Sequence, residues 1–244
     1  MSEIYQPPSA ELTQQDNLSQ LERAVEGDYQ FTILEAFREG RELANGHKWP
    51  IQKAGLMMFL VVLPAYLLFL IAPSFLFSEE GAASILASTA GNLLYIWITT
   101  PISAGLLLMA ANRATGNDID TSYLWAYFSQ ASKLLGVMLL MYVFITLGFL
   151  LLIIPGIYLS IAYLFATALA ADKGLGVWDA LETSRKAISK RWFAFFGLCL
   201  LLAFVNMIAM IPLGLGLIWT FPWSLCTMGV VYRNMFGFEA KTRA

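Results

Sequence analysis

The sequence predicts an all-α, polytopic membrane protein with six transmembrane helices arranged as three hairpins, each preceded by an amphipathic interfacial helix. Two observations support this fold class. Of the 244 residues, 58% are hydrophobic and only 13% are charged, about half the charged share of an ordinary globular domain, which is roughly 25%. The uncharged residues also form four long runs, and a membrane span needs about 20 predominantly apolar residues. These runs are 54–78, 81–112, 134–171 and 192–232.

The third run shows how the spans divide. It extends from Leu134 to Ala171, 38 residues without a charge, and would measure roughly 57 Å as one helix. The bilayer core is only about 30 Å thick. Pro155 removes a backbone donor, and Gly156 tolerates the φ values of a chain reversal. We therefore expect two spans to meet at Pro155 and Gly156.

The fourth run, of 41 residues, is expected to divide in the same way near Pro212 to Gly216. The first two runs each hold one span. The fourth span is short, so it is expected either to gain length from Asp172 to Gly174 or to be partly re-entrant. The six predicted spans are about 54–77, 86–110, 134–154, 157–171, 193–212 and 216–233.

The basic residues predict the orientation, because Lys and Arg accumulate on the cytoplasmic side. With six spans, the segments 1–53, 112–133, 172–192 and 233–244 share one side and contain five, two, five and three basic residues. These are all 15 in the chain, so both termini are expected in the cytoplasm. Trp49 and Trp192 then lie at the cytoplasmic interface, and Trp219 and Trp223 near the other end of span six.

An internal repeat supports three similar units. The segment "ILEAFREGREL" at 33–43 aligns without gaps with "VWDALETSRKA" at 177–187, and both contain a small residue followed by Arg, at Arg41 and Arg185. Apolar residues recur at helical spacing in both, which predicts short amphipathic helices at the membrane interface. A weaker third copy is "SYLWAYFSQASK" at 122–133. The predicted interfacial helices are about 31–45, 121–132 and 177–191, within a membrane domain at 31–236.

The helix at 177–191 contains the candidate site. Its basic residues are candidates for contact with anionic lipid or a cytoplasmic partner, at about 1 kcal/mol for each charge near an anionic leaflet. Positive-inside topology alone would also produce such a cluster. We expect Val177, Trp178, Leu181 and Ile188 to face the acyl chains. The four candidate residues are Arg185, Lys186, Lys190 and Arg191.

The polar segment 1–30 is expected to be a disordered cytoplasmic tail, and 237–244 a cytoplasmic C-terminal tail. "YQPP" near the N-terminus favours an extended polyproline conformation, so Tyr5, Pro7 and Pro8 are candidates for docking a protein partner. A solvated tail with incidental prolines is the alternative. No nucleic-acid partner is expected, and the sequence leaves the oligomeric state open.

Catalytic chemistry is not expected. The uncharged runs that hold the predicted spans contain no Asp, Glu, Lys, Arg or His, although intramembrane catalysis and ion coupling depend on such groups. The single histidine, His47, lies in a cytoplasmic loop, so no catalytic, cofactor or metal residues are predicted. Asn206 is expected to bond between helices, and the small residues Ala162, Ala166 and Ala170 to allow close helix packing.

The segment around "PGIYLSIAYLFATALAADKGLGVWDALETSRKAISKRW" resembles uncharacterised bacterial inner-membrane proteins of the YciC type and the membrane domain attached to some glycerophosphodiester phosphodiesterases. The resemblance covers about residues 134–233, and more loosely 31–112. It implies a bacterial inner membrane but no activity, because the chain has no phosphodiesterase domain. The elements of the shared pattern are Pro155, Gly156, Tyr158, Ala180, Leu181, Ser184 and Trp192.

Two functions remain open. The first is a non-catalytic scaffold or envelope-maintenance factor that acts through lipid or partner contacts of its cytoplasmic helices. The second is a transporter or flippase-like carrier of a lipid or amphipathic solute. A polar groove lined by Asn206, Thr99 and Thr100 would favour the second.

Overall fold

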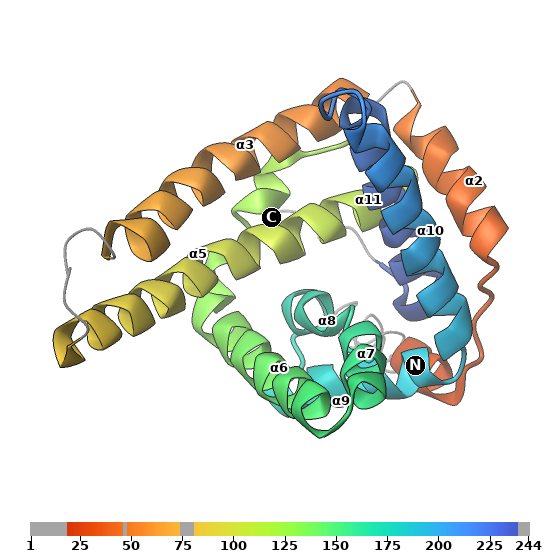
Figure 1. Ribbon diagram of the computed structural model, residues 1–244. Coiled ribbons are helices and arrows are strands. Elements are labelled where there is room, and N and C mark those ends of the chain that lie inside the picture. Colours follow the sequence, from red (N-terminus) through yellow and green to blue (C-terminus); the bar gives the residue numbers. More distant parts are fainter. Residues whose placement is uncertain (1–18, 46–47, 74–80, 239–244) are drawn as a thin grey trace, which may run out of the picture.

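The computed structural model describes residues 19–45, 48–73 and 81–238, and this part of the chain is all-helical. Three helix pairs, α3–α5, α6–α7 and α10–α11, surround the centre of the molecule, and α2 lies along the outside of the last pair (Figure 1). The helices are α2 (Ile33–Ala44), α3 (Lys48–Tyr66), α5 (Ala82–Ala114), α6 (Ala131–Leu151), α7 (Ile153–Ala162), α8 (Ala166–Asp172), α9 (Val177–Ser189), α10 (Trp192–Met210) and α11 (Leu217–Phe236). The π-helix η1 (Leu67–Ile71) continues α3, and two 3₁₀ turns, η2 (Thr121–Leu124) and η3 (Phe128–Gln130), precede α6.

Five segments of the described chain are long and apolar enough to cross a membrane. α11 has 20 residues but is not among them, because Arg233 and Asn234 near its end lower its mean hydropathy. The sixth predicted span therefore stays a prediction. The five segments are Lys48–Ile71, Ala82–Ala114, Thr121–Leu151, Ile153–Asp172 and Trp192–Met210.

The turn between α6 and α7 lies earlier than predicted. The chain reverses at Leu152, which has an extended backbone, so Pro155 and Gly156 belong to the first turn of α7. Proline is tolerated there because the first N–H groups of a helix have no acceptor. Gly156 serves close packing instead of reversal: a Cβ there would lie 2.7 Å from Cδ2 of Phe149.

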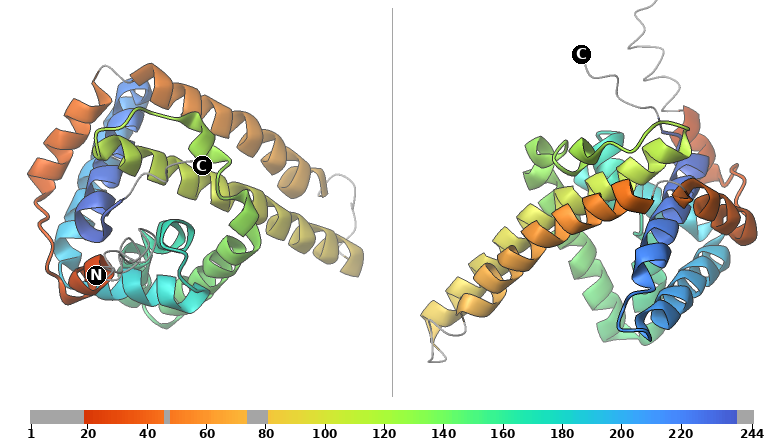
Figure 2. Two further views of the ribbon diagram at one scale, coloured as in Figure 1. Left: turned by 180° about the vertical axis from the view of Figure 1, so that it is seen from behind. Right: turned by 90° about the horizontal axis from the view of Figure 1, so that it is seen from above.

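The turn between α10 and α11 is where the sequence predicted it. α10 ends at Met210 and α11 begins at Leu217. Between them Leu213 has φ 55° and Gly214 has φ 80°, which are left-handed conformations that end a helix. The right-hand view of Figure 2 places this loop and the α6–α7 turn on one side of the molecule, opposite α2.

The predicted interfacial helix at 121–132 is wrong. This segment forms η2 and η3 instead of one amphipathic helix. The Asp120 carboxylate accepts from the Ser122 backbone N–H at 2.9 Å, a local bond that competes with helix formation. The segment lies directly on α5, where a Cβ on Gly105 would approach the Tyr123 carbonyl carbon to 2.9 Å.

The three segments that precede the hairpins form a closed ring of contacts. The segment before α6 packs on α5, the second helix of the first hairpin. α9 packs on α7 and α8, which end the second hairpin, and α2 packs on α11, which ends the third. Each leading segment thus contacts the last helix of the preceding unit, and the first segment closes the ring on the last unit. This arrangement supports the three-unit interpretation of the repeat.

The position of α11 corrects the expected place of two tryptophans. Trp223 stacks on Phe37 of α2 with ring centroids 4.1 Å apart, and its indole N–H donates to the Phe37 carbonyl at 2.7 Å. Gln52, near the start of α3, donates to the Ile218 carbonyl at 2.8 Å. Trp219 and Trp223 therefore lie beside residues that the charge pattern places at the cytoplasmic end of span one, because α11 packs along α2.

The core lies where α7 gives way to α8. Phe165, in this break, makes edge-to-face contacts with Phe195, Tyr232 and Phe236 at centroid distances of 6.3, 5.6 and 6.0 Å. Such geometry is favoured by the ring quadrupole. The stripe of Ala162, Ala166 and Ala170 is fully buried, as its predicted role in close packing requires.

The chain is ordered earlier than the expected tail boundary. Residues 19–26 are helical, and the Tyr29 hydroxyl donates to the Ala187 carbonyl at 2.9 Å. At the other end, Phe238 is buried. The segment 1–18, which contains Tyr5, Pro7 and Pro8, and the segment 239–244 lie outside the described residues.

Candidate lipid-contact site

The candidate site is built on α9, the amphipathic helix of the third unit. It begins after Gly176, and Asp179 in its first turn is favourable near the positive end of the helix dipole. Lys186 in its last turn is favourable at the opposite end. The helix ends at Ser189, so Lys190 and Arg191 lie in the connection to α10.

The apolar face of α9 is buried in protein and does not face lipid along its length. Leu181 is 2% exposed and Ile188 is fully buried, so their expected contact with acyl chains is wrong. The reason is that α9 covers the last helix of the second unit. Trp178 remains 58% exposed, and of the expected apolar contacts it is the one that fits a lipid-facing position best.

Ser184 fixes α9 to the break between α7 and α8. Its hydroxyl donates to the Ala162 carbonyl at 2.8 Å and accepts from the Phe165 N–H at 3.3 Å. Both groups lie at the ends of interrupted helices and would otherwise be unpaired in the core. In the repeat alignment Ser184 corresponds to Gly40, which lies in close contact with Thr227 of α11.

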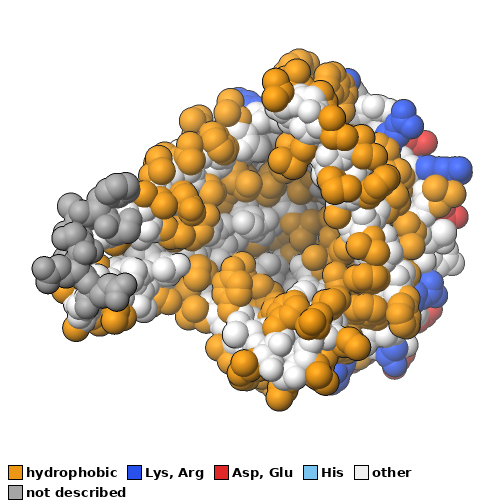
Figure 3. Space-filling view, viewed as in Figure 1, with side chains coloured by type: hydrophobic (Ala, Val, Ile, Leu, Met, Phe, Trp, Pro, Cys, Tyr) orange, Lys and Arg blue, Asp and Glu red, His pale blue; other side chains and the backbone are white. Residues whose placement is uncertain are grey.

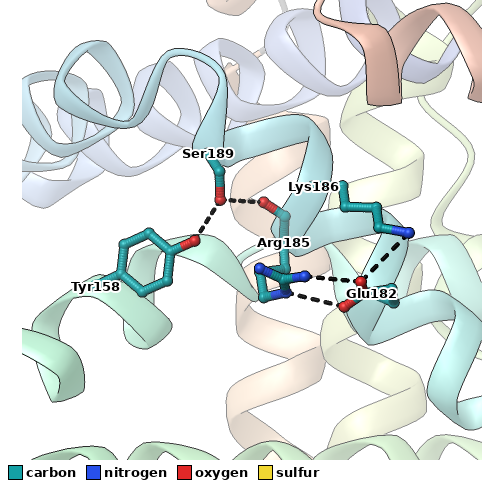
Figure 4. Close-up of polar contacts among 5 residues, drawn as sticks. All are labelled: Tyr158, Glu182, Arg185, Lys186 and Ser189. Atoms are coloured by element: carbon teal, nitrogen blue, oxygen red, sulfur yellow. Dashed lines mark hydrogen bonds and ion pairs between the residues drawn. The ribbon is translucent and has the colours of Figure 1, made fainter.

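The polar face of α9 contains an ion-pair network (Figure 4). Arg185 donates two hydrogen bonds to the Glu182 carboxylate, at 2.9 and 2.7 Å, and Lys186 lies 3.3 Å from the same carboxylate. Hydrogen bonding from Arg185 lowers the pKa of Glu182 and raises the pKa of Arg185 itself. Both groups stay charged, and the bidentate pair orients the guanidinium.

A second set of bonds positions the end of α9. Ser189 Oγ donates to the Arg185 carbonyl at 2.5 Å, and the Tyr158 hydroxyl donates to Ser189 Oγ at 2.5 Å (Figure 4). The Trp192 indole donates to the Tyr158 carbonyl at 3.2 Å. Tyr158, Ser184 and Trp192 of the sequence pattern therefore all form hydrogen bonds that fix α9 or the start of α10 to α7.

The two remaining cations differ from each other. The Arg191 guanidinium donates to the Phe31 carbonyl at 3.3 Å and lies 5.5 Å from the ring centroid of Tyr29. Burial raises the pKa of Tyr29 to about 12, although the Arg191 charge acts in the opposite direction. Lys190 has no ion pair among the described residues. Of the four predicted residues, Arg185 and Lys186 therefore share the Glu182 carboxylate on α9, and Arg191 bonds to Phe31. Lys190 is exposed.

The polar residues of the spans bond within the helix bundle. Asn206 donates to Ser224 Oγ at 2.8 Å and accepts from the Thr220 hydroxyl at 2.9 Å, which confirms its predicted bonding between helices. Thr99 and Thr100 donate to carbonyls of their own helix. In the described part of the chain no hydrogen bond joins these threonines to Asn206.

Sequence reasoning missed a buried polar cluster at the end of α8. The side chains of Asp172 and Lys173 are only 6% and 4% exposed, and their charged atoms are 3.6 Å apart. The Tyr232 hydroxyl donates to Asp172 at 2.9 Å, while Lys133 donates to the Ala170 and Gly174 carbonyls at 3.2 and 2.7 Å. Adjacent charges at a span boundary resemble ordinary interfacial residues, so the sequence held no signal of this burial.

No group of three or more metal-ligating side chains occurs among the described residues. Comparison with protein-family models, curated proteins and solved structures finds no match to this chain. The resemblance to YciC-type proteins therefore stays a prediction. The fold and the five long apolar helices define the chain as a multi-pass helical membrane protein.

Proposed function

We propose that this chain is a non-catalytic protein of the bacterial inner membrane, with both termini in the cytoplasm, that acts as a scaffold or envelope-maintenance factor by binding anionic lipid through α9. The observation that supports this most is the position of Lys186 and Lys190. Lys186 keeps half of its side chain exposed, and Lys190 has no ion pair in the described part of the chain.

The contacts around these lysines support a binding role. Ser184 holds α9 against the core, and Glu182 faces two cations, Arg185 and Lys186, with one carboxylate, so this face keeps a net positive charge. Arg191 joins the end of α9 to Phe31, and the exposed Lys186 and Lys190 are the charges that lipid phosphates would meet. Each lysine near an anionic leaflet contributes about 1 kcal/mol.

The test is native mass spectrometry of lipid retention. Wild type and Lys186→Gln/Lys190→Gln are released from matched nanodiscs of phosphatidylglycerol and phosphatidylcholine. The proposal expects the variant to lose up to about 30-fold in phosphatidylglycerol retention, the equivalent of two surface charges. A matched control is Arg38→Gln/Lys53→Gln, which removes two exposed charges from α2 and α3. Equal retention by all three proteins would contradict the proposal.

A carrier of lipids or amphipathic solutes is the second candidate. Figure 3 shows a hollow between the α3–α5 pair and α10, rimmed by hydrophobic side chains, and α7–α8 is a discontinuous span of the kind that transporters use. Reconstituted protein that scrambles a fluorescent phospholipid between leaflets would support this candidate. Scrambling at the rate of empty liposomes would exclude it.

The N-terminal Tyr5, Pro7 and Pro8 are retained as a proposed docking segment for a protein partner, at a stretch outside the described residues. A synthetic peptide of residues 1–18 competing for a partner that copurifies with the full chain would test this role. Copurification that the peptide does not reduce would contradict it.

A further inference from the structure

A pocket of about 280 Å³ lies between the end of α2, the start of α3 and the first turns of α11. This volume is smaller than the roughly 300–1,000 Å³ typical of sites for whole drug-sized ligands, so it suits a lipid headgroup. The polar and aromatic residues that line it are Arg41, Asn45, Lys48, Trp219, Thr220 and Trp223.

The pocket has an uncompensated positive charge. Arg41 and Lys48 both line it, and neither has an ion pair among the described residues. Of the two carboxylates closest to Arg41 in the sequence, Glu39 pairs with Arg233 at 2.8 Å, and Glu42 is not a lining residue. The pocket lies at the start of the 19-residue α3, whose dipole favours an anion, and at the end of α2, whose dipole has the opposite sign. The charges of Arg41 and Lys48 are therefore what attracts an anion.

Hydrogen bonds to residues outside the pocket fix two of the side chains that line it. The Trp223 indole is fixed by its bond to the Phe37 carbonyl, and its face receives the Arg41 guanidinium at 5.6 Å from the ring centroid. Thr220 is fixed by its bond to Asn206 on α10. A cation stacked on a fixed aromatic ring has little freedom to lose on binding, which favours affinity.

The surroundings of the pocket are amphipathic. Trp49 is 77% exposed and Trp219 is 55% exposed, and exposed indoles of membrane proteins settle at the level of the lipid headgroups. Cations and indoles side by side in one pocket match a ligand with a phosphate head and apolar tails.

We infer that this pocket binds the phosphodiester headgroup of a single anionic phospholipid, with Arg41 and Lys48 on the phosphate and the two exposed tryptophans beside the glycerol and the first acyl carbons. The inference rests on the proposed function in assuming contact with anionic lipid. The inferred site is distinct from α9, because it is formed by α2, α3 and α11. It would hold one bound lipid molecule, whereas the lysines of α9 would contact the membrane surface.

The test uses the full chain in nanodiscs that contain a small fraction of phosphatidylglycerol in phosphatidylcholine, with retained lipid counted by native mass spectrometry. Arg41→Gln/Lys48→Gln removes both pocket cations, and Arg38→Gln/Lys53→Gln removes two exposed cations from the same helices outside the pocket. We expect the pocket variant to lose one tightly held phosphatidylglycerol, with a retention about 20-fold below wild type, and the control to stay within about twofold. Lys48→Gln alone keeps the Arg41–Trp223 contact and should lose about fivefold.

Equal losses in the pocket variant and the control would overturn the inference, because they would reflect general surface charge. Retention of the lipid by both variants would overturn it as well. A soluble arm adds sn-glycerol 3-phosphate to wild type: displacement of the lipid at millimolar concentration would assign the pocket to a soluble phosphate ester and overturn the lipid assignment. If the α9 lysines prove necessary and the pocket cations do not, the proposed function stands and this inference alone fails.

Discussion

Gly40 of α2 and Thr227 of α11 are in such close contact that a Cβ atom on Gly40 would lie 2.6 Å from the Thr227 backbone nitrogen. This contact closes the ring of the three units, because it joins the first leading segment to the last helix. It also sets the geometry of the pocket, since Arg41 follows Gly40 directly and Trp223 lies one turn before Thr227.

Gly40→Ala is therefore expected to destabilise the protein. The new methyl group meets backbone atoms of α11 that cannot rotate away, and overpacking of this kind costs about 1–3 kcal/mol. The measurement is the thermal midpoint in detergent, which should fall by about 2–4 °C for each kcal/mol. Gly81→Ala is the control, because a Cβ at Gly81 meets nothing within 4 Å. A midpoint for Gly40→Ala equal to that of the control would contradict the close contact.

Ser184→Ala should destabilise the protein more than Ser160→Ala. The first change leaves the Ala162 carbonyl and the Phe165 N–H without their partner in the core, at a cost of about 1–3 kcal/mol. Ser160 bonds only to the Gly156 carbonyl of its own helix, so its loss is small. Thermal unfolding of both variants is the measurement, and equal midpoints would show that Ser184 does not hold α9 in place.

The α6–α7 turn predicts a labelling pattern. In a background with Cys199 and Cys226 replaced, Leu152→Cys should react with an impermeant thiol reagent added outside intact cells, because Leu152 is 68% exposed at the turn. Gly156→Cys should stay unreactive, since Gly156 is buried against Phe149. Rapid labelling of the cysteine at position 156, with none at position 152, would contradict the turn at Leu152 and support a chain reversal at Pro155 and Gly156.

Tyr29 predicts a loss of stability at alkaline pH. Its folded pKa of about 12 lies above the ordinary value of 10.0, so the folded state resists loss of the phenol proton more than the unfolded state does. The stabilisation from the neutral phenol is complete below pH 10 and disappears as pH rises from 10 to 12. The thermal midpoint of wild type should fall more steeply across this window than that of Tyr29→Phe. Parallel profiles would place the Tyr29 hydroxyl in contact with solvent.

The sequence predicted those features that depend on local pattern. Uninterrupted apolar runs located the long helices, and Pro212 to Gly216 located the last turn, because left-handed residues there end a helix. The repeat located α2 and α9 within a few residues. Asn206 was assigned correctly because an amide in a span must find a partner in a neighbouring helix.

Features that depend on contacts between units could not be predicted in this way. Nothing local distinguishes a glycine that reverses the chain from Gly156, which admits the Phe149 ring. An amphipathic pattern shows which face of α9 is apolar, but it does not show whether lipid or the α7–α8 break covers that face. The pairing of Trp223 with α2 joins residues far apart in the chain, so the pocket at Arg41 and Lys48 left no sequence signal.

The orientation of the chain tests the account most directly, because both proposed lipid sites require α2, α9 and the termini to face the cytoplasm. The measurement is a set of reporter fusions after Lys53, Arg113, Arg191 and Ala244, with one near Glu80. We predict cytoplasmic signals from the first four and an outside signal from the last. A periplasmic signal after Ala244 would contradict the six-span orientation, and one after Arg191 would remove α9 from the anionic cytoplasmic leaflet on which the proposed function depends.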